Sequence, residues 1–125
     1  MKVIRREEQQ KIRRQTSETL TVFDQKTGEP IGEVLDMSAK GLKLVGKGPI
    51  ASRRIYYCRM PLKKNIDGCE EVFFDAECRW CKKSDEAGKY NSGFLLRYSS
   101  PKDAAIVQKL IFSWMVNRTE RMSIR

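Results

Sequence analysis

The residues best suited to bind a ligand form a short polar segment with the spacing D-x-S-x-x-G, namely Asp36, Ser38 and Gly41. An ionised aspartate accepts hydrogen bonds, a serine hydroxyl donates or accepts them, and a glycine lets the backbone turn tightly. These groups suit binding through hydrogen bonds. The same residue types are also those that an ordinary tight turn prefers, so the motif is weak evidence by itself. Its meaning depends on the sequence around it.

A second chemical signal is positive charge, because 25 lysines and arginines against 16 acidic residues give a net charge of +9. Such an excess predicts an anionic partner, which can be a nucleic acid, a membrane surface or a phosphorylated small molecule. The alternative is that most of the lysines only solvate the surface. The charge is concentrated near the two ends of the chain, in Arg5, Arg6, Lys11, Arg13 and Arg14 and in Arg118, Arg121 and Arg125.

The chain has no histidine, so it lacks the commonest general base and the commonest metal ligand. Cysteines occupy positions 58, 69, 78 and 81, and the last two form a C-x-x-C. A zinc ribbon needs two such pairs, and a redox pair should open a helix, whereas this pair lies in a predicted strand. We therefore expect reduced cysteines that pack as small apolar side chains, with no metal, no cofactor and no enzyme activity.

A length of 125 residues suits a single domain. Residues 1–15 are almost entirely polar and charged, which predicts a flexible or marginally helical basic arm. Residues 16–118 carry the core, and residues 119–125 form a basic tail. Alternating apolar residues predict strands over 19–23, 31–36, 42–45, 54–60, 72–82 and 90–98, with a loop over 61–68. These strands indicate a small antiparallel barrel or sandwich.

A helix is predicted after the last strand, because Ser100 can cap it and Pro101 fits its first turn. Apolar residues follow at helical spacing, namely Ala104, Val107, Leu110, Ile111, Trp114 and Met115, with Ile106, Phe112 and Val116 outside that stripe. This wide apolar surface fits a helix docked on the barrel, and it also fits a helix that binds a partner or a second copy of the chain.

The sequence gives no sign of a membrane span or of export. No apolar stretch reaches the roughly 20 residues that a transmembrane helix needs. The N-terminus has no apolar signal core and carries acidic residues directly after its arginines. We therefore expect a cytoplasmic protein.

The order of these features resembles the PilZ family, bacterial domains that bind cyclic di-GMP. The resemblance runs from about residue 9 to residue 117 and includes the basic cluster, the D-x-S-x-x-G motif, residues 90–96 and the terminal helix. It implies a mainly β fold, a six-stranded antiparallel split barrel with a C-terminal helix. It also implies that Asp36 and Ser38 bond to a guanine edge and that Gly41 lets the backbone turn close beneath the ligand.

The family also has an R-x-x-x-R element before the first strand, and this chain departs from it. Counting back from the motif, Arg13 or Arg14 fits the second arginine, whereas Gln9 or Gln10 occupies the first position. Arginine clamps phosphate and stacks on a purine, but glutamine has no charge. Losing such a contact costs ~1.5–3 kcal/mol, about tenfold to a hundredfold in affinity. Lys11 is an accessory cation that could compensate.

Four classes of function can be weighed against the sequence. The leading interpretation is a cyclic di-GMP receptor without catalysis, whose arm closes over the ligand and acts on an unidentified output protein. The second is a PilZ-like adaptor that has lost nucleotide binding and works through protein contact. A third is nucleic-acid binding by a basic barrel, with Tyr56, Tyr57 and Trp80 as candidate stacking residues, although strand aromatics more often lie in the core. An enzyme fits least well, because no base or orienting group is identifiable.

Overall fold

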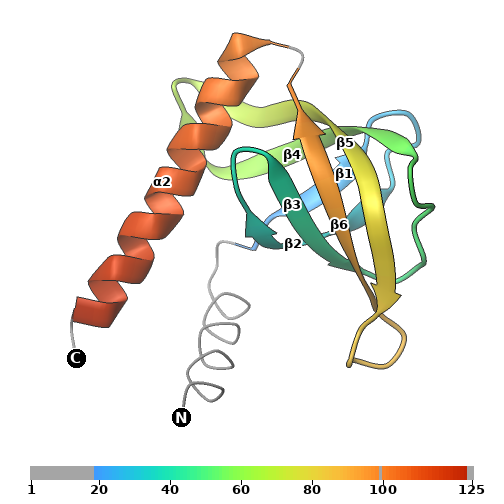
Figure 1. Cartoon of the computed structure of the whole chain (residues 1–125). Helices are drawn as coiled ribbons and strands as arrows, with labels where there is room; N and C mark the ends of the chain where they lie inside the picture. Colours follow the sequence, from blue (N-terminus) through green and yellow to red (C-terminus); the bar gives the residue numbers. More distant parts are fainter. Residues whose placement is uncertain (1–18, 99, 124–125) are drawn as a thin grey trace.

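The computed structural model describes residues 19–98 and 100–123. Six antiparallel strands close into a barrel in the order β1-β2-β3-β6-β5-β4, and the helix α2 follows them (Figure 1). The strands are β1 (Thr21–Asp24), β2 (Pro30–Met37), β3 (Gly41–Gly46), β4 (Ile55–Ile66), β5 (Cys69–Lys83) and β6 (Tyr90–Arg97), and α2 is Pro101–Ser123. The predicted six-stranded barrel with a C-terminal helix is confirmed. The predicted arm, residues 1–15, lies outside the described residues.

Alternation along the strands places one set of side chains inside the barrel. In β5, Val72, Phe74, Ala76 and Cys78 are each no more than 1% exposed. Cys58 in β4 joins the same core, and its burial is the main reason that the pKa of its thiol rises to about 12. All four cysteines are free. Cys58 and Cys78 therefore pack as small apolar core residues, as predicted.

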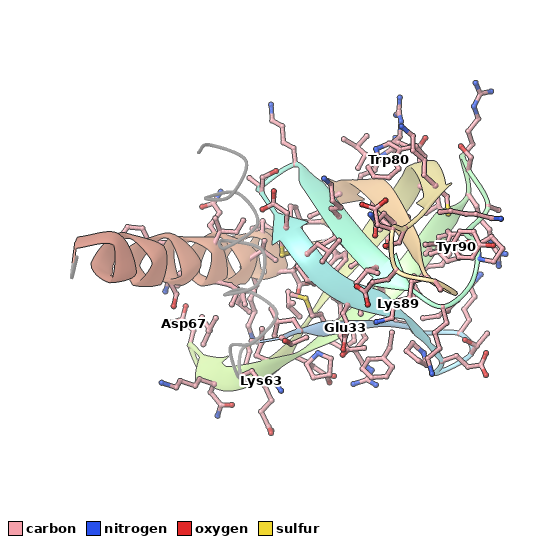
Figure 2. All side chains as sticks on the ribbon, turned by 90° about the horizontal axis from the view of Figure 1, so that it is seen from below. Glu33, Lys63, Asp67, Trp80, Lys89 and Tyr90 are labelled. Atoms are coloured by element: carbon pink, nitrogen blue, oxygen red, sulfur yellow. The ribbon has the colours of Figure 1, made fainter. Side chains whose placement is uncertain are left out.

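The prediction of a loop over 61–68 is wrong, because β4 and β5 form a longer hairpin. Its turn consists of Asp67 and Gly68, both with positive φ, at 52° and 80°. Pro61 pairs with Glu71 beside an irregularity in the register, a place where a sheet tolerates proline. Figure 2 shows the end of this hairpin, with Asp67 beside α2.

The first turn of α2 fixes the helix to the barrel. The N–H of Asp103 donates to Ser100 Oγ at 3.2 Å, and the Ser100 hydroxyl donates to Asp103 Oδ2 at 2.7 Å, so the predicted Ser100 cap is confirmed. Asp103 Oδ1 also accepts the backbone N–H of Phe73 in β5 at 3.2 Å. Ile106 and Val107 then pack into the core.

The rest of α2 extends past the barrel (Figure 1). Phe112 is 67% exposed, whereas Ile106 is 2% exposed, so Ile106 belongs to the buried face although the predicted stripe left it out. The helix also includes residues 119–123, which the sequence placed in a basic tail. Within the described ranges, no helix combines the length and apolarity that crossing a membrane requires.

Candidate functional site

The turn between β2 and β3 carries the D-x-S-x-x-G motif and is closed by its own hydrogen bonds. The N–H of Ser38 donates to the carbonyl of Gly41 at 2.8 Å, and the N–H of Gly41 donates to Ser38 Oγ at 3.1 Å. The Tyr98 hydroxyl donates to the carbonyl of Ala39 at 3.0 Å and ties the turn to the chain after β6. Ser38 therefore stabilises the turn, which confirms that the motif has a structural use.

A row of four residues extends from this motif across four neighbouring strands. An irregularity in β2 pairs Asp36 with Lys43 in β3, Lys43 pairs with Gly93 in β6, and Gly93 pairs with Trp80 in β5. The next residue of β6, Phe94, is buried in the core, so the row lies on the outer surface of the sheet. The barrel thus brings a carboxylate, an ammonium group, a glycine and a tryptophan together from separate strands.

This row forms part of a pocket of about 230 Å³. The pocket is lined by Asp36, Met37, Ser38, Gly41, Leu42, Lys43, Arg79, Trp80, Gly93 and Phe94. Asp36 is exposed, and its carboxylate accepts the N–H of Met37 at 3.0 Å. The three motif residues proposed for the ligand therefore lie at one pocket, where a ligand can reach the Asp36 carboxylate.

Trp80 reaches the outer surface because of a bulge in β5. The inward alternation that ends at Cys78 would place position 80 inside the barrel, but the register shifts between Cys78 and Trp80, which leaves Arg79 as the extra residue. Trp80 is half-buried, and a Cβ atom on Gly93 would collide with its indole. Gly93 is thus the bare backbone surface on which the indole lies.

Cations surround this indole. The ammonium groups of Lys43 and Lys82 lie 5.9 Å and 5.7 Å from its ring centroid. Arg79 is exposed at the edge of the same pocket. The pocket therefore offers a carboxylate, an aromatic face and positive charge, a combination that suits a ligand containing both a base and a phosphate.

Gly41 lines the pocket, although neither its backbone conformation nor its surroundings require glycine at this position. Its φ is not in the left-handed region, and a Cβ atom there would make ordinary contacts, 3.5 Å from the carbonyl oxygen of Phe94 and 3.6 Å from Ser38 Oγ. The barrel would therefore accept an alanine at this position. The close approach of a ligand to Gly41 stays a prediction.

The structure supplies a site only in part, because the predicted arm residues Gln9, Gln10, Lys11, Arg13 and Arg14 lie outside the described residues. It also adds residues that the sequence analysis did not assign to this site, namely Lys43, Arg79, Trp80 and Gly93. Their positions depend on the pairing of β3, β6 and β5 and on one bulge. No local pattern in the sequence indicates that pairing.

A second cavity, of about 630 Å³, lies elsewhere on the barrel. Its lining includes three acidic and three basic side chains, Asp24, Glu29, Glu33, Lys47, Arg54 and Lys89. In Figure 2, Glu33 and Lys89 lie well apart from Trp80. Because its charges are balanced and it contains no motif residue, the smaller pocket is the better candidate for an anionic ligand.

Solved protein structures share the fold of this chain. No curated protein sequence matches the chain. Its structure is similar to apo MrkH of K. pneumonia, with a TM-score of 0.64 and 14% identity over 85% of this chain and 50% of that one. It is also similar to the Bacillus subtilis inhibitor of motility, MotI/DgrA, with a TM-score of 0.60 and 14% identity over 82% of this chain and 49% of that one.

The chain spans about half the length of these two proteins, and a likeness at such low identity shows the fold alone. The family itself is shown by the sequence. The family model of the PilZ domain matches residues 4–113, which is most of the chain. The chain therefore belongs to the PilZ domain family.

Proposed function

We propose that this protein is a cyclic di-GMP receptor that relays the signal by contact with an output protein and has no catalytic step. The observation that supports the proposal is the pocket shared by Asp36, Ser38 and Trp80 in a PilZ domain. The motif comes from the β2–β3 turn, and the tryptophan comes from β5 on the other side of β3 and β6.

The chemistry of this pocket suits a guanine nucleotide. The Asp36 carboxylate can accept the ring N–H and amino donors of one guanine edge, and Ser38 can add a hydroxyl contact. The exposed part of the Trp80 indole can stack on a purine, a contact worth about 1–3 kcal/mol for each base. Lys43 and Lys82, whose ammonium groups lie near this indole, would supply positive charge for the phosphates.

The small size of the pocket supports the proposal that the arm completes the site. Ligand pockets usually hold roughly 300–1,000 Å³, whereas this pocket holds about 230 Å³. We therefore infer that one base binds at the barrel and that the N-terminal arm binds the rest of the dinucleotide. Arg13 or Arg14 would bind phosphate or a guanine edge, with Gln9, Gln10 and Lys11 as accessory contacts.

The test is calorimetric titration of the full chain with cyclic di-GMP at physiological salt. We expect micromolar or tighter binding, weakened at least about tenfold by Arg14→Ala or by Trp80→Ala. Tryptophan fluorescence gives a second readout, because Trp80 and Trp114 are the two tryptophans and Trp114→Phe leaves Trp80 as the reporter. Absence of binding up to high micromolar concentration would reject the receptor.

A second candidate function is an adaptor that works through α2 without binding nucleotide. The observation that favours it is the 67% exposure of Phe112 on a helix that extends past the barrel. Such a surface can bind an output protein or a second copy of the chain. Light scattering over a concentration series, with Phe112→Ser as the comparison, distinguishes self-association through this face from a monomer.

A further inference from the structure

The carboxylate of Glu77 in β5 binds two arginines from two strands. Arg97 Nη2, from β6, lies 3.2 Å from Glu77 Oε1, and Arg79 Nη1, from the β5 bulge, lies 3.7 Å from Glu77 Oε2. The Glu77 side chain is 20% exposed, whereas those of Arg97 and Arg79 are 61% and 59% exposed. The two guanidinium groups are thus matched in charge, exposure and partner.

The two contacts with Glu77 differ in strength. Arg97 donates a hydrogen bond to the carboxylate, but a separation of 3.7 Å is too long for one from Arg79. An exposed ion pair without a hydrogen bond contributes little to stability. If Arg79 moves away, Glu77 keeps Arg97 as its partner, so no half-buried carboxylate is left alone. Arg79 is therefore free to change its partner at little cost.

The two arginines also differ in position. Arg79 lines the pocket that contains Asp36 and Trp80, and Arg97 does not. The bulge explains the difference, because it turns two successive residues, Arg79 and Trp80, toward one pocket, whereas regular strands send successive side chains to opposite faces. A ligand stacked on the indole would place its phosphates within reach of this guanidinium.

We propose that Arg79 is a phosphate-binding arginine of this site, held beside the pocket by Glu77 and released to the ligand on binding. This inference rests on the proposed function. Arginine is suited to the role because its planar guanidinium can bind phosphate with two hydrogen bonds. The arm has glutamine at the first motif position, so the barrel supplies from β5 a guanidinium that the arm lacks.

The test compares variants of the full chain in titrations with cyclic di-GMP. We expect Arg79→Ala to weaken binding about tenfold or more, while Arg97→Ala, the matched control, changes it by less than about threefold. Arg79→Lys should lie between wild type and Arg79→Ala, because lysine keeps the charge and loses the paired hydrogen bonds. Glu77→Gln should bind severalfold more tightly, because it removes the carboxylate that competes with phosphate.

The outcomes separate this inference from the function on which it rests. Absence of binding by the wild type rejects both. Binding by the wild type that Arg79→Ala leaves unchanged, or that Arg79→Ala and Arg97→Ala weaken equally, overturns the role of Arg79 alone. A Glu77→Gln variant that binds no more tightly than the wild type overturns the release from Glu77. Because Arg79 is exposed, its variants should keep the wild-type melting temperature, which verifies folding.

Discussion

The indole of Trp80 lies so close to the backbone of Gly93 that a single added Cβ atom would overlap its ring. The two residues are paired neighbours on β5 and β6, 13 positions apart in the sequence. This contact orients the aromatic side of the pocket, and the D-x-S-x-x-G turn forms the opposite side.

Gly93→Ala should displace the indole and weaken cyclic di-GMP binding about as much as Trp80→Ala does. The added methyl group overpacks the contact, which typically costs about 1–3 kcal/mol of stability. In a Trp114→Phe background, the Trp80 emission should shift to the red as the ring moves into water. Gly48→Ala is the control, because a Cβ there has no atom within 4 Å. An unchanged emission and affinity for Gly93→Ala would contradict the arrangement.

Asp36→Ala should lower affinity for cyclic di-GMP by about tenfold to a hundredfold, because the carboxylate is the acceptor for a guanine edge. The melting temperature of the ligand-free domain should change little, since Asp36 is exposed and its bond to the N–H of Met37 joins two adjacent residues. Calorimetric titration and thermal unfolding measure the two effects. A large loss of stability would mean that Asp36 is mainly structural.

Gly41→Ala should lower the affinity for cyclic di-GMP without lowering the stability of the domain. The site accepts a Cβ at ordinary contact distances, and replacing glycine stiffens the unfolded chain, so stability should stay the same or rise by about 0.4–1 kcal/mol. Affinity should fall, because the methyl group would occupy the surface on which the ligand rests. Urea unfolding and titration of one preparation test both parts. Retained affinity would show that the ligand does not approach Gly41.

Stability should decrease with increasing pH above the ordinary thiol pKa because of Cys58. Burial raises its pKa from 9.0 to about 12 in the folded state. Between these values the unfolded thiol loses its proton and the folded thiol keeps it, which favours unfolding. The contribution is complete below pH 9 and falls by up to about 1.4 kcal/mol for each pH unit above it.

Urea unfolding of the wild type and of Cys58→Ala, measured from pH 8 to pH 10.5, isolates this contribution. The wild type should lose stability more steeply than the variant. Cys78, whose pKa burial also raises, remains in both proteins and so cancels in the comparison. Parallel pH profiles for the two proteins would show that Cys58 is not protected from ionisation.

The sequence by itself determined the elements whose signals are local. Ser100 and Pro101 indicated the start of α2, because capping and the first-turn position of proline depend on neighbouring residues only. The alternation in β5 indicated a strand, and the D-x-S-x-x-G spacing indicated the turn. The extension of β4 past Pro61 was not predicted, because a strand accepts proline there only beside a register irregularity with its partner strand.

Tertiary structure decided how the pocket is assembled. Strict alternation from Val72 to Cys78 would direct Trp80 into the core, and one bulge at Arg79 directs it outward instead. The row from Asp36 to Trp80 exists because β3 pairs with β6, which joins the β2–β3 hairpin to the β5–β6 hairpin from a distant part of the chain. The alternation of side chains along a strand is a local property, whereas register and bulges depend on the partner strands. Which residues line the pocket is therefore decided only when the strands pair.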